Sequence, residues 1–530
     1  MPVAKPSKAE VAVLYAEWKL AGSPPIEIFS RQVKNRSPMT VRRCLQKYAK
    51  EYGLAQNAEP IVPKTFDKKI RKAPRYVITS AQNATPIHKG FFAALRRYCE
   101  AHSAELIVIP IRYRNPTSMW SANDSGDDWW DPAVRPYLND SRHMLCSNLA
   151  VLADIKVQPT ATDPISGLES ISRGESCIVG HPKVALTVAP APSHATPKLI
   201  VTTGSVTEAN YTNTKAGKKG EFHHSLAAVV VELSGKTFHL RHVSAVADGS
   251  FIDLDTEYSA KAIKNAPPAL AVVMGDTHAW FADKSVLNAT FDAADSLVRT
   301  VRPAHIVWHD TLDFYSANHH HRGEPFIALA KHNNGYADVE KEVRHAFSLV
   351  GKYMAMFKNT KHVFPHSNHD AALYRWVKEC DWRSDPRNAV FYLETALYLA
   401  KNTAMKGNGA STPDPFKYWG EKLLANPERC NFLTADEAFV LAGVSLGNHG
   451  HMGANGARGS LRGVAKQGVK SIVGHSHTPG IYEGGMQVGT TSLLRLGYNK
   501  GASSWLHTHA VLYANGKRTL INFINGRYKS

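Results

Sequence analysis

The segment ALAVVMGDTH, residues 269–278, decides how the second half of this chain folds. Its first six residues are apolar and predict a buried β-strand, and Gly275 and Asp276 follow where that strand ends. Asp276 and His278 then offer a carboxylate and an imidazole, which both bind divalent metals. A strand that delivers such groups at its carboxyl end is typical of an α/β domain with a site at one edge of its sheet.

Four more short motifs of similar composition follow, each where a strand is expected to end. They are His309-Asp310, Ser367-Asn368-His369-Asp370, Asn448-His449-Gly450 and Gly474-His475-Ser476-His477. None contains a thiol, which argues against a structural zinc site. Because the ends of parallel strands meet at one edge of a sheet, the five motifs together predict a two-metal hydrolase.

The third domain is expected to cover residues 267–530. Strands are predicted at 269–274, 304–308, 362–365, 439–446, 471–473, 510–513 and 519–524, with helices at about 282–301 and 338–357. A helical insertion is expected at about 381–435, between the third and fourth motifs. Alternation of strands and helices indicates an α/β fold.

A mixed α/β middle domain is predicted for residues 75–266. It begins with a strand, a helix and a strand at 76–80, 88–102 and 105–110, a pattern that implies parallel pairing. Residues 213–224 combine Gly and Lys and predict a loop, either one that approaches phosphate or an exposed hairpin loop. His223 and His224 in this segment are not assigned to the site.

Residues 1–55 predict a small domain of three helices, at 9–20, 26–33 and 41–52, with Ser37 or Thr40 as a cap and Gly53 as the last C-cap. The pattern resembles a helix-turn-helix module, and its last helix would offer Arg42, Arg43, Lys47 and Lys50 to DNA. A three-helix bundle without nucleic-acid contact is the alternative. Residues 56–74, with Lys68 and Lys69, predict a basic linker that also contacts DNA.

The charge of the chain is uneven. Its formal net charge is +18, and residues 1–75 hold 16 Lys and Arg against 6 Asp and Glu, a net of +10. Such a basic segment favours a polyanionic partner, here DNA, unless it is only a solvated face.

Six scattered cysteines predict reduced, mostly buried thiols in a cytoplasmic protein, in the host cytoplasm if a phage encodes it. No apolar run reaches the roughly 20 residues of a bilayer span, and the N-terminus lacks the apolar core of a signal peptide, so no membrane insertion is expected.

Residues from about 268 to 525 resemble the calcineurin-like metallophosphoesterase superfamily, whose motifs are D-x-H, G-D-x-x-D, G-N-H-[DE], a lone His and G-H-x-H. His309 and Ser367 stand where that family has Gly, which leaves the ligand positions intact but puts the shape of the nearby loops in doubt. The resemblance implies a β-sandwich flanked by helices, in an α/β/β/α arrangement.

The resemblance also implies a role for each matching residue. Asp276, His278 and His477 would hold a first metal, Asn368, His449 and His475 a second, and Asp310 would bridge them around a nucleophilic hydroxide. His369 would be catalytic, beside the leaving-group oxygen. Asp313, Asp370, His309 and His451 would orient ligands or face the substrate, and His451 is a second candidate for the lone-His position. Mn²⁺ is the favoured metal, and Mg²⁺, Fe²⁺ and Zn²⁺ are also compatible.

The layout of the whole chain resembles the pre-early nucleases with which some tailed phages degrade host DNA. This implies a homo-oligomeric DNA phosphodiesterase. The alternatives are an exo/endonuclease of the double-strand-break-repair type and a small-molecule or protein phosphatase with an accessory DNA-binding domain. A DNA-binding regulator with a degenerate fold is a further class, against which the intact ligand set argues.

Overall fold

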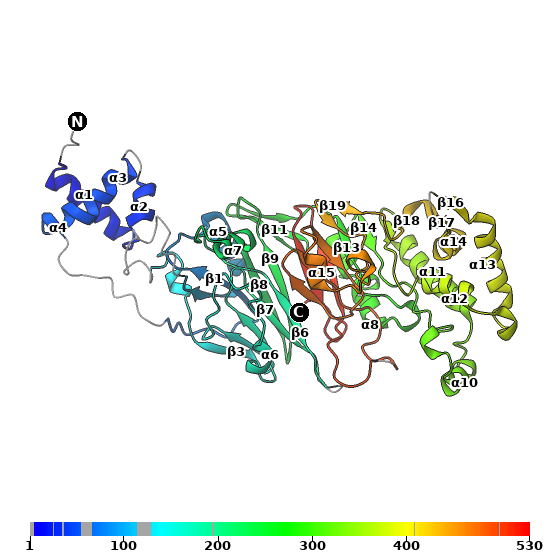
Figure 1. Cartoon of the computed structure of the whole chain (residues 1–530). Coiled ribbons are helices and arrows are strands. Elements are labelled where there is room, and N and C mark those ends of the chain that lie inside the picture. Colours follow the sequence, from blue (N-terminus) through cyan, green and yellow to red (C-terminus); the bar gives the residue numbers. More distant parts are fainter. Residues whose placement is uncertain are drawn as a thin grey trace. The chain divides into compact units, whose positions relative to one another are not determined.

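The computed structural model describes residues 5–24, 26–33, 36–54, 66–113, 129–192, 195–406, 409–497 and 499–530 (Figure 1). Two compact units are present: Met1–Thr187 with Lys198–Ala266 and Ser530, and Val188–Pro197 with Pro267–Lys529. The sequence had placed residues 188–197 in the middle domain. The mixed α/β class is confirmed, whereas the sandwich stays a prediction. Among the described residues, no helix combines the length and apolarity needed to cross a bilayer.

Three helical segments form the N-terminal module of the first unit, as predicted. They are α1 (Lys8–Leu20), α2 (Ile26–Gln32) and α3 (Pro38–Arg43), which continues through a π-helical stretch, Cys44–Tyr48, into α4 (Ala49–Glu51). Ser37 caps α3, since its hydroxyl accepts from the Thr40 amide at 3.2 Å. The module has its own core of Val11, Leu14, Phe29, Val41, Cys44, Leu45, Tyr48 and Ala49.

The prediction of a linker at residues 56–74 is wrong for its second half; residues 56–65 lie outside the described residues. Phe66 is 8% exposed in the core of the first unit, and its carbonyl accepts from the Asp140 amide at 2.7 Å. The Lys68 ammonium pairs with Glu105 at 2.9 Å. An aromatic anchor and a buried ion pair therefore tie the basic segment to the folded unit, a contact that composition alone does not reveal.

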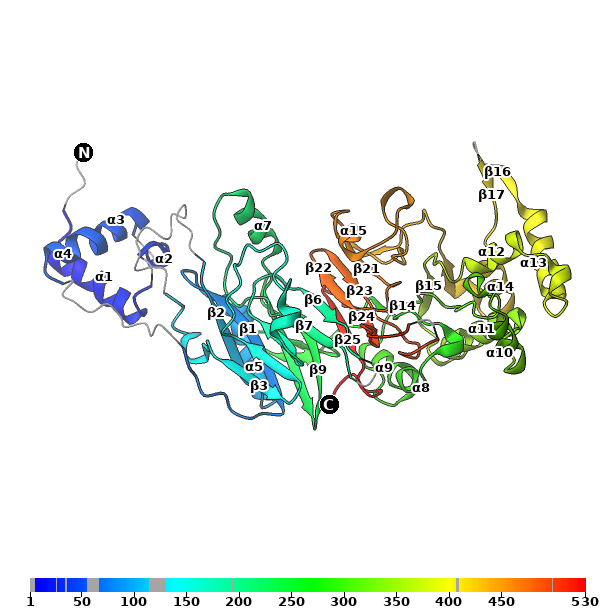
Figure 2. The same ribbon diagram turned by 60° about the horizontal axis from the view of Figure 1, so that its bottom comes forward.

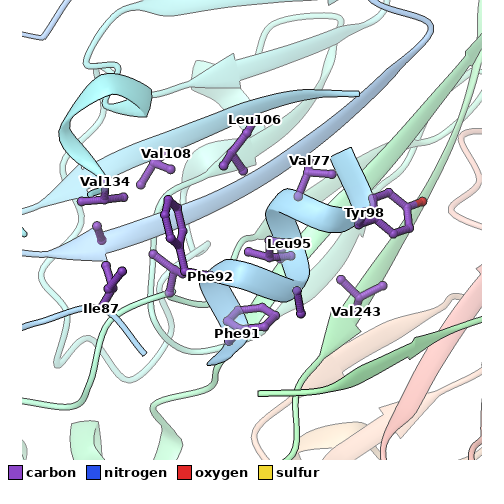
Figure 3. Close-up of a cluster of buried hydrophobic side chains, with 14 of the residues drawn as sticks. Val77, Ile87, Phe91, Phe92, Leu95, Tyr98, Leu106, Val108, Val134 and Val243 are labelled. Carbon is purple, nitrogen blue, oxygen red and sulfur yellow. The ribbon is translucent and has the colours of Figure 1, made fainter. Parts of the chain in front are cut away.

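The predicted strand–helix–strand of the first unit is confirmed. β1 (Arg75–Gln82) and β2 (Glu105–Ile111) pair in parallel, with α5 (Lys89–Ala101) between them in sequence. β8 (Ala227–Ser234) and β9 (Thr237–Ser244) complete a sheet of order β2-β1-β8-β9. Figure 3 shows why α5 forms here: its apolar face, including Phe91, Leu95 and Tyr98, packs toward side chains of these strands.

The first unit contains further strands. Four of them lie in the order β7-β5-β4-β3, with the bounds β3 (Arg142–Cys146), β4 (Leu149–Leu152), β5 (Ser176–Val179) and β7 (Lys198–Thr202). Three more form an antiparallel meander: β10 (Phe251–Asp253), β11 (Thr256–Tyr258) and β12 (Ile263–Asn265). The turn Arg135–Tyr137 precedes β3, and α6 (Leu168–Ile171) lies between β4 and β5 in sequence. β6 (Leu186–Ala189) spans the change of unit.

The loop predicted at residues 213–224 is wrong, because it forms α7 (Lys215–His223). Thr214 caps the helix by accepting from the Gly217 amide at 3.1 Å. Gly217 and Gly220, which made the segment read as a loop, face the rest of the unit, where a Cβ would lie 2.0 Å from the Thr212 carbonyl oxygen and 2.9 Å from the Tyr211 ring. Close packing thus offsets their low helix propensity.

The main sheet of the second unit has the order β18-β15-β14-β13-β24-β25. Its first four strands are mutually parallel. β24 pairs antiparallel with β13, and β25 pairs antiparallel with β24. The bounds are β13 (Ala271–Val273), β14 (His305–Val307), β15 (Lys361–Phe364), β18 (Cys430–Phe432), β24 (Thr508–Leu512) and β25 (Arg518–Asn522). The strands predicted at these places are confirmed, and β18 was missed.

A second set of strands in this unit has the order β19-β20-β21-β23-β22. The bounds are β19 (Val440–Leu441), β20 (Val444–Ser445), β21 (Lys470–Val473), β22 (Gly480–Tyr482) and β23 (Gly485–Gln487). The single strand predicted at 439–446 is wrong, because β19 and β20 are a hairpin. Ala442 and Gly443 both have positive φ, 47° and 72°, as a two-residue hairpin turn requires.

Helices of the second unit agree with the sequence in part. α11 (Val339–Met356) is confirmed, but the helix predicted at 282–301 is broken into α8 (Lys284–Leu287), a π-helical stretch (Asn288–Asp292) and α9 (Leu297–Val301). The Ser296 hydroxyl donates to the Phe291 carbonyl at 3.1 Å and so replaces a helical bond at the break. The second unit also contains α10 (Pro325–Asn333) and α15 (Leu461–Ala465). Short 3₁₀ turns lie at Ala279–Phe281, His319–His321 and Ala454–Gly456.

The segment predicted as a helical insertion, residues 381–435, contains helices in its centre but also contains strands. α12 (Ala372–Glu379) precedes it, α13 (Ala389–Asn402) and α14 (Pro415–Leu423) lie within it, and 3₁₀ turns occupy Trp382–Ser384 and Pro427–Arg429. A hairpin of β16 (Ala404–Lys406) and β17 (Gly409–Ser411) projects between α13 and α14 (Figure 2). Residues 430–432 are wrongly included, because as β18 they extend the main sheet.

Candidate metal centre

The five motifs come together in the second unit. β13 leads to Asp276 and His278, β14 to His309 and Asp310, and β15 to Asn368 and His369. His449 follows the β19–β20 hairpin, and His475 and His477 follow β21. Gly275 lets the first strand end pass close to its neighbours, since a Cβ there would lie 2.8 Å from the Thr490 carbonyl carbon and the Thr508 oxygen.

Among the described residues, three groups of side chains place their ligand atoms within 4.8 Å of one another. The groups are Asp276, His278, Asp310 and His477; His278, Asp313 and His369; and Asp310, His449 and His475. Asp310 belongs to the first and third groups, so one carboxylate lies between two sets of ligands. Asn368 joins the third group, since its Oδ1 lies 3.1 Å from His475 Nδ1.

The ligand atoms point at one another at short distances. His278 Nε2 and His477 Nε2 are 3.0 Å apart, and His477 Nε2 lies 3.1 Å from Asp276 Oδ2. On the other side of the cluster, His449 Nε2 lies 3.1 Å from Asp310 Oδ2. Two imidazole nitrogens at 3.0 Å cannot both carry a proton aimed at the other, whereas both can face a shared cation.

The donor set fits a divalent metal. Both carboxylate oxygens of Asp276 and Oδ2 of Asp310 are buried without a hydrogen bond, although His477 and His449 lie within ion-pair distance. Burial of a carboxylate without full compensation is costly, and a cation removes that cost. Carboxylate, amide oxygen and imidazole donors suit hard or borderline divalent ions. These buried His and Asp groups can therefore hold a metal ion.

Electrostatics of the cluster keep its carboxylates ionised. Burial by itself would raise the pKa of Asp310, but His449 and His369 outweigh it and hold that pKa well below its usual range. Burial likewise opposes the effect of Asp310 on His449, whose pKa nevertheless rises to about 9. His278 behaves in the same way: Asp313 outweighs burial and raises its pKa to about 9. The carboxylates are thus already charged for a cation, whereas His278 and His449 must each release a proton before they bind one.

The backbone is strained at the same places. His278, Asp310, His475 and His477 have φ values of 41°, 42°, 78° and 58°, in the left-handed region that side chains with a Cβ adopt rarely. Such strain costs on the order of 1–3 kcal/mol per residue and is concentrated at functional sites. The surrounding fold therefore keeps four of the ligand candidates in a backbone conformation that they would not adopt by themselves.

Of three residues predicted to orient ligands, two contact a ligand side chain and the third contacts the backbone after Asp310. Asp313 Oδ2 is 3.1 Å from His278 Nδ1, and His309 Nδ1 is 3.2 Å from His449 Nδ1. Asp370 acts on the backbone: its carboxylate accepts from the Leu312 amide at 2.8 Å. These contacts hold ring directions and the loop after Asp310, which is how outer partners support a metal site.

His369 and His451 lie at the accessible side of the cluster. His369 is half-buried, and its Nδ1 donates to the Asp313 carbonyl at 2.6 Å, which leaves Nε2 as the atom that can act on a substrate. The ring of His451 lies 5.4 Å from that of His449 and 5.6 Å from that of His366, between centroids. Burial, with His449, lowers the pKa of His451 to about 3.

Two neighbours of the site were not found from the sequence. Glu342 on α11 is 2% exposed and accepts from the Tyr315 and Ser316 amides at 2.9 and 3.0 Å, so it shapes the loop after Asp313. Burial and Asp313 raise its pKa to about 7. Its place in the apolar stripe of α11 is the sequence signal that could have revealed it. His366 directly precedes the motif Ser367-Asn368-His369-Asp370.

Residues assigned to DNA contact lie in the first unit. Arg43, Lys47 and Lys50 are exposed on one continuous helical segment, and Arg42 is half-buried. Lys69 is exposed, whereas Lys68 is bound to Glu105. All six cysteines are free thiols, as predicted, but only Cys44 and Cys177 are fully buried.

Gly474 lies directly against Asp276, and a side chain at position 474 would not fit there. A Cβ added to it would lie 2.2 Å from Asp276 Oδ1 and 3.0 Å from the His309 ring. Because the Asp276 side chain is short and fully buried, it would have to move away from the cluster. We expect Gly474→Ala to weaken metal binding about 10–100-fold, as changes beside metal ligands do.

Isothermal titration with Mn²⁺ measures this effect. Gly497→Ala is the matched control, because no atom of the described residues lies within 4 Å of a Cβ at Gly497 and its φ is not positive. Equal metal affinity in both variants and the wild type would contradict the role given to Gly474.

Fold and site together define a mixed α/β protein with a buried His/Asp cluster that can hold a metal ion. Sequence comparison adds a relative: the chain is 33% identical over 486 residues to Protein A1 of Escherichia phage T5, and the match covers 89% of this chain and 86% of that protein. The chain belongs to the family of that phage protein, so the predicted relationship to a phage protein is confirmed. No family model and no solved structure matches the chain.

Proposed function

We propose that this protein is a metal-dependent deoxyribonuclease of the calcineurin-like metallophosphoesterase type, a phage early protein that degrades host DNA. The observation that carries the proposal is the position of Asp310, which two groups of buried ligands share. A carboxylate shared in this way is what a pair of divalent cations requires. The relationship to a phage protein and the basic N-terminal module support DNA as the substrate.

In this proposal the metals activate the phosphodiester and the attacking water, and the residues of the chain hold the metals. Two bound divalent cations, Mn²⁺ by preference, would polarise the phosphodiester and lower the pKa of an attacking water. Asp276, His278 and His477 would hold one cation, Asn368, His449 and His475 the other, and Asp310 both. The half-buried Asn368, His369 and His475 mark the side from which a phosphodiester enters, since the other ligands are buried.

His369 performs the proton step in this proposal. Its Nδ1–H is held by the Asp313 carbonyl, so Nε2 is the atom that carries a proton to the leaving alkoxide. The ring also packs edge-on against His278, with 4.7 Å between centroids, which fixes it beside the ligand group. His369 therefore acts from a defined position without being a ligand.

The direct test is incubation of the purified protein with closed circular and linear DNA, with Mn²⁺, Mg²⁺ or EDTA. We expect loss of both forms with Mn²⁺ and none with EDTA. Cleavage of linear DNA alone would identify an exonuclease of the repair type. Hydrolysis of a small phosphomonoester without any effect on DNA would overturn the proposal in favour of a phosphatase.

The N-terminal module should strengthen binding to DNA. Because residues 66–74 are part of the folded first unit, the deletion that tests this is of residues 1–54. We expect weaker binding to long DNA and a flatter dependence on salt, by about one unit of slope for each phosphate that the module neutralises. Cleavage of a small chromogenic phosphodiester should persist, because all candidate ligands lie beyond residue 275.

A substitution separates charge from fold in this test. Replacing the exposed Arg43, Lys47 and Lys50 by Ala should reproduce the flatter salt dependence. The charge-matched control replaces three exposed lysines elsewhere, Lys236, Lys261 and Lys358. An equal change in the control, or none in either variant, would show that the module does not contact DNA.

A further inference from the structure

α13 has an inner face that its own unit buries. Phe391, Thr395 and Leu399 are at most 7% exposed. The Phe391 ring stacks on that of Trp419, with 4.4 Å between centroids, and the Thr395 hydroxyl accepts from the Trp419 indole at 3.0 Å. These contacts account for the packing of α13 against α14.

The outer face of α13 is apolar as well. Val390, Leu393 and Leu397 are 77%, 44% and 54% exposed, and Ala400 is exposed too. Figures 1 and 2 both show α13 at the margin of its helical group, away from β14. Single exposed apolar side chains are ordinary, but four on one face of one helix mark an interaction surface.

The spacing of these residues identifies the shape of the partner. They recur at steps of three, four and three residues, which is the a/d repeat of a coiled-coil seam. A strand or an irregular loop does not match that repeat, whereas a second helix does. The partner is therefore a helix with the same period.

The flanking positions favour a second copy of this helix. Ala389 and Ala396 lie on one side of the seam and carry no charge. Glu394 lies on the other side, but it is turned to its own unit, where it pairs with Lys422 and accepts from the Tyr418 hydroxyl at 3.2 Å. Between Leu393 and Leu397, at the centre of the seam, no charge of α13 therefore opposes its image, and the exposed Lys401 lies at the end of the helix.

We propose that α13 pairs with α13 of a second copy of this chain, antiparallel, about a two-fold axis near its middle. In that register Leu393 lies opposite Leu397 of the partner subunit, and Val390 lies opposite Ala400 of the partner subunit. Large residues meet at the centre, and a large residue meets a small one at each end. The stripe is self-complementary, as a two-fold interface requires.

Sedimentation velocity over a concentration series from 1 to about 100 µM, a range that spans the affinities of small helical interfaces, measures this association. The test variant is Leu393→Glu with Leu397→Glu, and we expect its mass to fall by at least half relative to the wild type. The matched control is Phe326→Glu with Leu329→Glu on α10, two residues that are 81% and 55% exposed. A wild type that is monomeric throughout, an unchanged test variant, or an equal fall in the control would overturn the proposal.

Cross-linking tests the direction of the pair and does not depend on how well the charged variant folds. Leu393→Cys protein mixed with Leu397→Cys protein should give a disulfide-linked heterodimer above the background of the six native thiols. Each variant alone should give much less. Efficient cross-linking of Leu393→Cys protein to itself would show a parallel pair and contradict the antiparallel arrangement.

Discussion

Asp310→Asn is expected to reduce DNA hydrolysis to the level seen without enzyme. Asp310 is the carboxylate shared by the group with Asp276, His278 and His477 and the group with His449 and His475, and its Oδ2 lies 3.1 Å from His449 Nε2. Asn has nearly the same shape, so the fold should persist, but a neutral amide cannot hold two cations together. The variant should also bind fewer metal ions, which mass spectrometry of the metal content measures independently of activity.

Asp295→Asn is the matched control for this substitution. Its side chain is 73% exposed and pairs only with Lys529, at 3.5 Å. We expect wild-type hydrolysis and metal content in the control. Turnover by Asp310→Asn equal to the wild type in excess Mn²⁺ would rule out this cluster as the active site, whatever the protein does to DNA.

Strand ends made much of the second unit predictable. An apolar run such as 269–274 is followed within a few residues by polar ligands, and three such runs became the parallel neighbours β13, β14 and β15. β18 was missed because its three residues are too short to show a period.

Local signals failed where distant contacts decide the structure. Gly217 and Gly220 favour a loop by propensity, yet they form a helix because Thr212 and Tyr211 leave no room for a side chain. The stretch 282–301 has helical composition, but Thr290 donates to the Val286 carbonyl and bonds with His509, near the place where the helix becomes π-helical. A residue more than 200 positions away cannot be read from local pattern.

The candidate site was likewise predictable where local sequence decides and not where distant contacts decide. Ligand types at strand ends were readable, because metals accept few side chains. The strained φ values of four ligand residues and the role of Glu342 were not, since they depend on how loops from separate strands meet. His309 illustrates this: it stands where the resembling family has Gly, and it fits because Gly474 leaves space beside it.

His369→Ala is expected to retain metal binding and to slow DNA hydrolysis by about 10²–10⁴-fold, the range typical of general acid–base catalysis. The reason is geometric: the Nδ1 bond to the Asp313 carbonyl aims Nε2 at the substrate side. The ring also packs edge-on against His278, so metal content is measured beside the rate. His345→Ala is the control, because that histidine is exposed on α11, outside the ligand groups.

A comparison of two substrates distinguishes a proton donor from a residue that only shapes the site. A nitrophenyl phosphodiester releases a stable phenolate, which needs little protonation, so the loss in His369→Ala should shrink strongly on that ester. A residue that only positions metals would lower both rates alike and would lower metal content too. An equal loss on DNA and on the activated ester, with both metals retained, would therefore exclude proton transfer to the leaving group and leave His369 the narrower task of stabilising charge on the phosphoryl oxygens.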